Sequence, residues 1–286
     1  MAPARPRPQT SPAVLRQELA DRLRELRLRA GMTIDDVAAQ LLVSASKISR
    51  IETASRPASL RDVRDLAGLY AVTPDELDSL MSLTQNSRRT SVWQQYGSAF
   101  SEHADLEDAA TSVAHYQTSL IPGLLQIEDY GHAITAGFRP NLAPEEQQRL
   151  TRARLARQDA LLGRGSPRLD YVLDEAALLR QVGGAGVLRR QLIALVEHSR
   201  LPAVTIRIIP MTAGAHPGMD SAFEIFSFPG VSGVVYLENL AGDFFLRRAS
   251  DLDRYGAAFR RLADSALDVA ASRRLIEDRA AVLPDE

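Results

Sequence analysis

Residues 33–52 read TIDDVAAQLLVSASKISRIE, and their pattern indicates the architecture of the N-terminal part of the chain. Its apolar positions indicate two short helices joined by a tight turn, with the small Ala38 where the two helices would cross closely. Val43 and Ile48 are apolar where the turn and the second helix would pack on the first. The pattern predicts a helix-turn-helix, which holds its second helix so that N-terminal side chains can enter the DNA major groove.

An ordinary αα-hairpin is the alternative interpretation of this stretch. Against it, Lys47 and Arg50 lie outside the apolar stripe, and residues 44–46 (SAS) form a small polar tip. Residues 1–64 also contain twelve Lys and Arg against seven Asp and Glu, an excess of five positive charges. Because the whole chain carries −2, the remainder carries −7, so we expect only the N-terminal part to meet a polyanion.

Further helix patterns surround the helix-turn-helix. One apolar stripe indicates a helix that ends near Gly31, and it consists of Leu15, Leu19, Leu23 and Leu26. Three later helices are expected to begin with a capping box, a hydroxyl residue followed three positions later by an acid: Thr33 with Asp36, Ser59 with Asp62, and Thr73 with Glu76. Together with a helix that opens at Ser44, these patterns predict an all-α domain of five helices.

The length of 286 residues favours two domains. We expect a flexible tail (1–12), a DNA-binding domain (13–84), a linker (85–101) that docks through Trp93, Tyr96 and Phe100, and a C-terminal domain (102–286). Within the C-terminal domain, residues 102–163 read as helical and residues 164–286 as α/β, with strands at Leu169–Leu173, Thr205–Ile209, Phe223–Phe228 and Val234–Leu237 and helices at about 174–182, 186–198 and 250–280. The predicted fold class is therefore an all-α five-helix domain followed by an α+β (mixed α/β) domain with a four- or five-stranded sheet.

Composition excludes several classes of site. The chain has no cysteine, so it cannot form disulfides, Cys-ligated zinc or iron–sulfur sites, or a thiol nucleophile. Its five histidines are isolated in the sequence, and no HExxH, GxSxG or Walker motif occurs, so we expect no metal, no cofactor and no enzymatic activity. No apolar run approaches a membrane span and no apolar leader opens the chain, so a cytoplasmic protein is expected.

One segment of the C-terminal domain could bind a ligand or partner. Residues 214–220 are rich in turn formers and bring His216 and Asp220 within a few positions. Glu175 and Glu238 each end a predicted strand, so we hypothesise that they converge with His216 at one edge of the sheet. Such a group could bind a small molecule or a cation, and the alternative is a plain connecting loop.

Residues 15–80 resemble the XRE (lambda-repressor/Cro-like) DNA-binding domains, and SASKISRIE (44–52) matches the recognition-helix pattern of that family. The resemblance places Ala45, Ser46 and Arg50 at base-reading positions and Lys47 within reach of base or phosphate. It implies phosphate contacts for Arg56 and Arg61, and the helix starts at Thr33 and Ser44 offer backbone N–H groups to phosphate. It also implies a partly buried ion pair between Arg27 and Glu52.

Three positions depart from the XRE pattern. Ile34 replaces the usual glutamine and cannot make its hydrogen bonds to the backbone and to a neighbouring side chain. Leu42 and Ala54 stand where the family has glycine. These two residues must either accept a positive φ, at about 1 kcal/mol each relative to glycine, or let the turns relax into another type.

Beyond the helix-turn-helix, the chain resembles the actinobacterial WhiJ-like family of XRE regulators. The segments that carry this resemblance include the IPGLLQ run (121–126), Val204–Pro210 and Tyr236–Glu238. The C-terminal domain of that family has no established biochemical function. The resemblance implies a transcriptional regulator that is often paired with a small acidic protein encoded nearby, in an arrangement likened to toxin–antitoxin systems.

These observations together predict a sequence-specific regulator of double-stranded DNA whose C-terminal domain binds a small partner protein or ligand. We expect a homodimer on a palindromic operator, with half-sites about 10 base pairs apart. The last helix, expected from Ser250 with Asp253 as capping box, is amphipathic and would form core or a dimer interface. Two alternatives remain: an antitoxin-like interaction protein, and an enzyme fused to a DNA-binding domain that acts through His216, Asp220 and Glu175.

Overall fold

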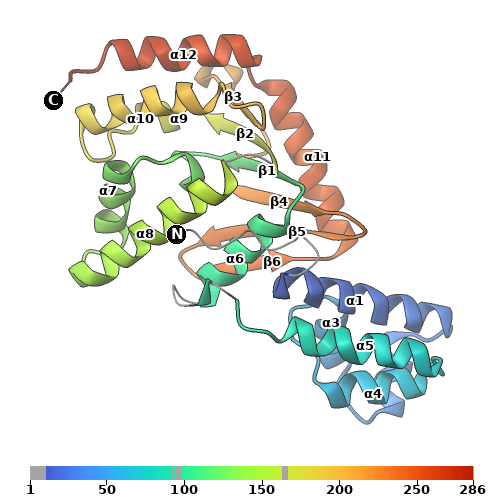
Figure 1. Cartoon of the computed structure of the whole chain (residues 1–286). Helices are drawn as coiled ribbons and strands as arrows, with labels where there is room; N and C mark the ends of the chain where they lie inside the picture. Colours follow the sequence, from blue (N-terminus) through green and yellow to red (C-terminus); the bar gives the residue numbers. More distant parts are fainter. Residues whose placement is uncertain (1–10, 92, 95–97, 163–166, 286) are drawn as a thin grey trace.

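The computed structural model describes residues 11–91, 93–94, 98–162 and 167–285. A small helical body, formed by the N-terminal part of the chain, lies beside a larger body built on a β-sheet (Figure 1). The arrangement agrees with the predicted fold class of a helical domain followed by a mixed α/β domain.

The N-terminal body has five α-helices between residues 12 and 87, as the sequence predicts. They are α1 (Pro12–Arg29), α2 (Ile34–Gln40), α3 (Ala45–Glu52), α4 (Leu60–Leu69) and α5 (Pro74–Ser87). The side chains of Thr33, Ser59 and Thr73 each form a reciprocal capping box with the acid three residues later, which confirms the three predicted helix starts. The buried face of each helix contributes to one apolar core, which includes Leu23, Val37, Ile48, Val63 and Leu80.

The C-terminal body contains a sheet of six described strands in the order β3-β2-β1-β4-β5-β6. The strands are β1 (Ser112–Gln117), β2 (Arg168–Asp174), β3 (Val204–Ile209), β4 (Phe223–Phe228), β5 (Val231–Asn239) and β6 (Gly242–Leu246). The first three are parallel to one another, and β4, β5 and β6 join them in an antiparallel meander.

The expected count of four or five strands is therefore too low, because β1 and β6 were not predicted. β1 lies inside the region expected to be entirely helical, and its sequence SVAHYQ carries His115 and Gln117 on the same face as Val113. Although its local strand pattern is weak, this segment forms a central strand because it pairs with β2 on one side and β4 on the other. Both partners lie more than fifty residues away in the sequence, where local pattern gives no information.

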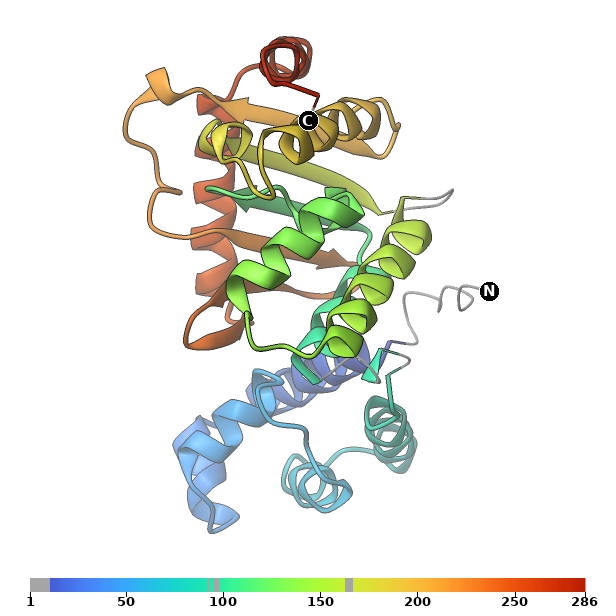
Figure 2. The same cartoon turned by 90° about the vertical axis from the view of Figure 1, so that its left-hand side faces the viewer.

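Helices cover both faces of the sheet (Figures 1 and 2). One face, with Val113, Tyr171 and Phe226, packs against several helices, namely α6 (Ser98–Ala109), α7 (Glu128–Phe138), α8 (Pro144–Leu161), α9 (Ala176–Leu179), α10 (Ala185–His198) and α12 (Val269–Ala281). The opposite face, with Tyr116 and Val172, packs against α11 (Ala249–Ser265) through Phe259 and Leu262. Two short 3-10 helices, η3 (Gly123–Leu125) and η4 (Met211–Ala213), complete the described elements.

The C-terminal helix differs from its prediction in two ways. The expected helix over 250–280 is interrupted after Ser265, and Asp268 caps the start of α12 by accepting a hydrogen bond from the Ala271 N–H. The interruption lets the Leu267 N–H donate to the Ile208 carbonyl, so the chain crosses from one face of the sheet to the other. The predicted capping box at Ser250 and Asp253 is absent, because α11 already begins at Ala249.

Helix α1 belongs to both bodies. Its first turn places Ala13 and Val14 in the apolar core of the C-terminal body, while its later turns carry Leu19, Leu23 and Leu26 into the N-terminal core. The α1 side chain of Asp21 also accepts a hydrogen bond from the Ser232 N–H of β5, at 2.8 Å. One continuous helix therefore fixes the two bodies relative to each other.

The connection between the bodies docks as predicted at Trp93, which is buried and donates its indole N–H to Asp108 of α6 at 2.8 Å. Tyr96 and the side chain of Phe100, the other expected docking residues, lie outside the described residues. Among the described residues, no helix is long and apolar enough to cross a membrane.

Candidate nucleic-acid interface

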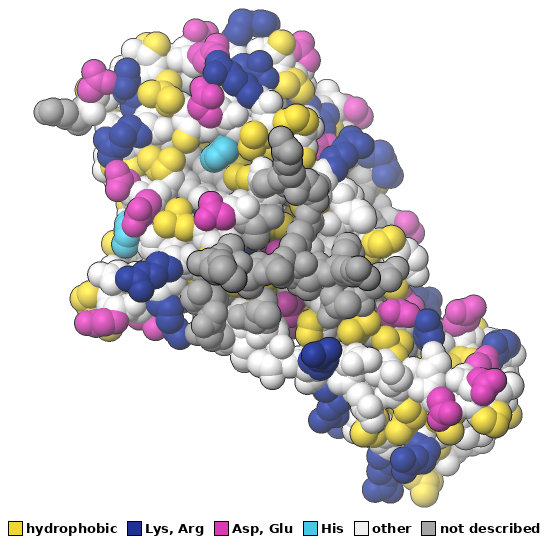
Figure 3. Space-filling view, in the orientation of Figure 1, with side chains coloured by type: hydrophobic (Ala, Val, Ile, Leu, Met, Phe, Trp, Pro, Cys, Tyr) yellow, Lys and Arg dark blue, Asp and Glu magenta, His cyan; other side chains and the backbone are white. Residues whose placement is uncertain are grey.

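The exposed surface of α3 is the candidate DNA-reading surface. Ser44 caps this helix, since its hydroxyl accepts a hydrogen bond from the Lys47 N–H at 3.2 Å. Ile48 and Ile51 are buried against the other helices, which turns Ser46 and Arg50 outward to solvent. Ala45 is half-buried at the same end of the helix. In space-filling view, basic side chains follow the lower edge of the N-terminal body (Figure 3).

Arg50 is the cation of α3 that stands free for an external partner, because no described carboxylate forms an ion pair with it. Lys47 differs from its expected role: its ammonium lies 2.5 Å from the carboxylate of Asp62 on α4. Burial would raise the pKa of Asp62, but hydrogen bonds from Lys47 and Ser59 lower it. Lys47 therefore links α3 to α4 in this structure and is not extended toward solvent.

The predicted phosphate contacts differ in availability. Arg56 is exposed after α3, and Arg61 is 89% exposed with only a loose ion pair to Asp65 at 3.7 Å. At Thr33, both the hydroxyl and the backbone N–H are engaged with Asp36 in the capping box. The Ser44 hydroxyl is likewise used inside the protein, so a phosphate at either helix start would meet backbone N–H groups of the first turn.

An ion pair between Arg27 and Glu52 is present where the XRE resemblance implied one. Arg27 donates from Nε and Nη2 to the two carboxylate oxygens of Glu52, at 2.8 and 2.9 Å, and from Nη1 to the Met32 carbonyl at 2.7 Å. Both side chains are buried. Since Glu52 is the last residue of α3, this two-pronged pair fixes the angle of α3 on α1.

The three departures from the XRE pattern have a clear structural outcome. Leu42 and Ala54 adopt positive φ values of 53° and 51°, so the turns keep the glycine-type conformation and accept its strain. Ala71 does the same at 51°. Ile34 packs against the apolar core of the N-terminal body, so it supports the helix start by burial and not by hydrogen bonding.

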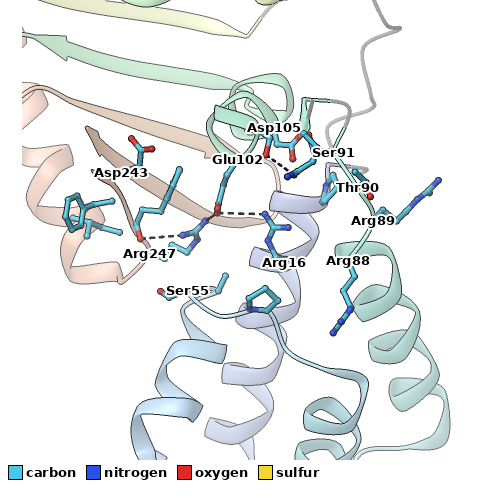
Figure 4. A pocket seen from close by; sticks show the side chains of 18 residues that line it. Arg16, Ser55, Arg88, Arg89, Thr90, Ser91, Glu102, Asp105, Asp243 and Arg247 are labelled. Carbon is cyan, nitrogen blue, oxygen red and sulfur yellow. Dashed lines mark hydrogen bonds and ion pairs between the residues drawn. The ribbon is translucent and has the colours of Figure 1, made fainter. Parts of the chain in front are cut away.

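A cavity of about 780 Å³ lies between the two bodies, next to the C-terminal end of α3 (Figure 4). Ala54 and Ser55 line it from the N-terminal body, and Arg247 lines it from the end of β6. Arg16 of α1 and Arg247 both point toward Glu102 of α6, at 3.9 and 2.8 Å (Figure 4). We call Arg16, Glu102 and Arg247 the junction triad, because it joins one residue of α1 to two of the C-terminal body.

The structure brings together only part of the predicted C-terminal group. His216 Nε2 lies 3.2 Å from Asp174 Oδ2, and the neighbouring Glu175 accepts hydrogen bonds from Arg279 and from the Met211 N–H, each at 2.8 Å. Burial opposes ionisation of Glu175, but these two donors lower its pKa. Asp220 is exposed and, within the described part of the chain, forms no hydrogen bond or ion pair with Glu175 or His216.

The predicted convergence of Glu238 with His216 is wrong. Glu238 shares a sheet face with Tyr236, which packs against the α6 side of the sheet. His216 instead packs against Tyr116, on the α11 side. Strands β1 and β4 also separate β5 from β2. The expectation failed because strand order and the face of each residue depend on pairing register, which the sequence did not reveal.

A buried charged cluster on the α6 side of the sheet escaped the sequence analysis. His103 Nε2 lies 3.0 Å from Glu224, and the Arg157 Nε donates to Glu107 at 2.8 Å. His115 lies 3.7 Å from the same carboxylate of Glu224. Although these histidines are isolated in the sequence, the fold brings His103 and His115 to the same carboxylate. The signal in the sequence was the spacing of His103 and Glu107, one helical turn apart.

Electrostatics favour the charged forms of His103 and Glu224 in this cluster, whereas burial lowers the pKa of His115 and raises that of Glu107. Burial lowers the pKa of His103, but Glu224 and Glu107 outweigh it and hold that pKa above its usual value. Burial opposes ionisation of Glu224, yet His115, His103 and Arg157 bring its pKa to about 2. The ligand atoms of His103, Glu107 and Glu224 lie within 4.8 Å of one another, a spacing that suits a metal ion. Arg157, bonded to Glu107 and 3.3 Å from His103 Nδ1, supplies positive charge at the same place.

The IPGLLQ run (121–126) is buried between the sheet and helices α7 and α10. Ile121 and Leu125 are fully buried, and the Ile121 N–H donates to the Tyr130 hydroxyl at 3.3 Å. Gln126 donates its side-chain amide to the Ile121 carbonyl at 2.7 Å, and Gln191 of α10 accepts from the Ile127 N–H. These bonds satisfy backbone groups at both ends of the buried 3-10 helix η3.

Comparison with known families agrees with this division of the chain. Residues 18–80 match a helix-turn-helix domain, and residues 100–278 match a domain described as "Domain of unknown function (DUF5753)". No curated protein and no solved structure matches the chain. The helix-turn-helix domain suggests a DNA-binding regulator. Because the second match spans more than half of the chain, the protein belongs to the DUF5753 family and carries a helix-turn-helix domain ahead of it.

Proposed function

We propose that the protein is a sequence-specific transcriptional regulator of the XRE type, related to the WhiJ-like regulators, whose C-terminal domain receives a ligand or a small partner protein. The observation that carries this proposal is the free guanidinium of Arg50 on an α3 that the Arg27–Glu52 pair holds rigidly on α1. A recognition helix needs such rigidity, because base contacts require fixed geometry.

In the proposed complex, α3 enters the major groove and Arg50 donates both guanidinium N–H groups to guanine O6 and N7. A bidentate contact of this kind is worth about 1–3 kcal/mol of discrimination against the wrong base. Ala45 and Ser46 face neighbouring base edges, and Lys47 reaches DNA if it exchanges Asp62 for phosphate. Arg56 and Arg61 contact phosphates, which orient the domain and carry no sequence information.

A homodimer on a palindromic operator fits this proposal, because a single small domain contacts few base pairs. The alternative input to the C-terminal domain is a small acidic protein encoded nearby, as in an antitoxin-like pair. We also propose that the protein is not an enzyme. In support, Glu175 is held by Arg279 and Asp220 points to solvent, so the residues suggested for catalysis are not gathered in one cleft.

The test measures binding of the full chain to two DNAs, the DNA upstream of its own gene and random DNA. Fluorescence anisotropy monitors binding at several salt concentrations. We expect tighter binding to the upstream DNA and weaker binding at higher salt. Arg50→Ala should reduce the preference for the upstream DNA, whereas Arg61→Ala should weaken binding to both DNAs equally. Equal affinity of the wild type for both DNAs would overturn the proposal.

A further inference from the structure

A second cavity, of about 280 Å³, lies on the α6 side of the sheet, beneath α7 and α8. Ligand pockets for drug-sized molecules usually measure about 300–1,000 Å³, so this one suits a smaller metabolite. The strands β4, β5 and β6 form its floor, and the IPGLLQ run closes one side through Ile121 and Gln126. We call it the sheet cavity. It does not include the His216 group, which lies on the opposite face of the sheet.

The floor of the sheet cavity is acidic. Glu224, Glu238 and Asp243 come from three adjacent strands and all line it. Glu224 is only 7% exposed, and its Oε2 has no hydrogen-bond partner in the described part of the chain. Asp243 accepts one hydrogen bond, from the Tyr236 hydroxyl at 2.6 Å. Glu238 stands at the more exposed end of the floor.

The opposite wall is basic. Arg154 and Arg157 on α8 and Arg139 after α7 line it. Arg157 is committed to Glu107, but Arg154 lies within ion-pair distance of no described carboxylate. A Cβ at position 131 would overlap the Arg154 guanidinium, so Gly131 provides the space in which this group lies. Burial together with Arg157 lowers the pKa of Arg154 to about 10, which leaves it positively charged near neutral pH.

Apolar side chains line the space between these two walls. Leu120, Ile134 and Leu150 are half-buried there, and Phe138 is 72% exposed at the surface beside them. The cavity thus offers an acidic floor, a basic wall and an apolar lining within one small volume. Buried charges are costly unless they are paired. Glu224 is paired with His103, but Arg154, Glu238 and Asp243 form no ion pair within the described residues and border the cavity.

We propose that the sheet cavity binds a small zwitterion, namely an α-amino acid with an apolar side chain. Its ammonium group would face Glu224 and Glu238, and its carboxylate would pair with Arg154, for which guanidinium geometry is well suited. A simple carboxylic acid would leave Glu238 and Asp243 without a counter-charge, and a simple amine would leave Arg154 without one. The proposal deepens the proposed function by naming the ligand class of the C-terminal domain. Binding of the amino acid does not require the proposed DNA-binding function, but its regulatory role rests on that function.

The sheet cavity lies next to the domain junction. Asp243 lines both cavities, and α6 carries His103 of the sheet cavity next to Glu102 of the junction triad. A ligand that shifts β6 or α6 would therefore act on Arg247 and Arg16, and through Arg16 on α1. This proximity gives the site a route to the DNA-binding body.

The experiment uses the full chain without DNA, so its result does not depend on the proposed DNA-binding function. The standard amino acids are screened at millimolar concentration by thermal shift, and those that raise the melting temperature are measured by calorimetry. We expect at least one apolar amino acid to bind with a millimolar or lower Kd. Its analogues that lack either the ammonium or the carboxylate group should bind at least about tenfold more weakly.

Two variants locate the site, each with a matched control. Arg154→Met and the near-isosteric Glu238→Gln should each weaken binding by about tenfold or more, which corresponds to about 1.4 kcal/mol. Arg152→Met on the exposed side of α8 and Glu277→Gln on α12 should leave binding unchanged. The proposal is overturned if no amino acid binds, if the singly charged analogues bind as well, or if binding survives both cavity variants.

Discussion

Arg27 of α1 donates to both carboxylate oxygens of Glu52, the last residue of α3, at 2.8 and 2.9 Å. The pair is buried, and it connects the helix that enters the C-terminal core to the helix proposed to read DNA. A shift of α1 relative to the sheet would therefore move α3 with it. The pair therefore couples the position of α3 to that of α1 and also stabilises the fold.

Loss of one partner of this pair should be costly. Arg27→Met leaves Glu52 buried without a counter-charge, and we expect a loss of about 3–5 kcal/mol in the free energy of unfolding, measured by urea denaturation. Removing both partners, as in Arg27→Met with Glu52→Leu, should restore a large part of that loss. The control is Arg29→Ala, whose pair with Glu76 is exposed and should contribute only about 0–1 kcal/mol. Equal losses in both single variants would contradict the assignment of a buried pair.

Strain at Leu42 should be measurable. Leu42 has a φ of 53° and is 93% exposed, so Leu42→Gly relieves backbone strain and removes little packing. We expect a gain of about 1 kcal/mol in unfolding free energy, reduced by the greater entropy of glycine in the unfolded chain. Ala39→Gly, at an exposed position inside α2, should lose about 1 kcal/mol in the same assay. Opposite signs for these two substitutions are the decisive result.

The buried cluster should make stability depend on acid pH. The pKa of Glu224 is lowered from 4.5 to about 2, so its contribution is present above pH 4.5 and is lost as the pH falls toward 2. Glu224→Gln should therefore be less stable than the wild type at neutral pH, and the difference should shrink over that acid window. Urea midpoints of both proteins across a pH series check this. A difference that stays constant with pH would show that the Glu224 charge is not involved.

The junction triad should couple the sheet cavity to DNA binding. If an amino acid occupies that cavity, we expect it to change the affinity for upstream DNA by about 5- to 150-fold, the usual range of allosteric coupling. Glu102→Gln weakens the bridge between Arg16 and Arg247 and does not alter the cavity lining. This variant should bind the amino acid as before and lose most of the effect on DNA. Anisotropy titrations with and without the amino acid measure the coupling, and undiminished coupling in the variant would exclude this route.

Much of the N-terminal body could be predicted from the sequence because its determinants are local. The Thr33–Asp36, Ser59–Asp62 and Thr73–Glu76 capping boxes each lie within four residues, and the helix bonds they start span the same distance. The positive φ at Leu42 was one of two alternatives that the sequence left open. The engagement of Lys47 with Asp62 was not foreseen, since it depends on how α4 packs against α3.

The candidate sites of the C-terminal body were decided by tertiary structure. His103 and Glu224 meet although 121 residues separate them, and their meeting depends on α6 lying over the sheet. The weak strand β1 forms only because β2 and β4 flank it, and the resulting register sends Glu238 and the Tyr116–His216 contact to opposite faces. In the N-terminal body, the helices, their caps and the helix-turn-helix followed from the sequence alone, since they depend on neighbours within a turn. Strand order, register and the meeting of distant charges required the folded chain, because only packing brings those groups together.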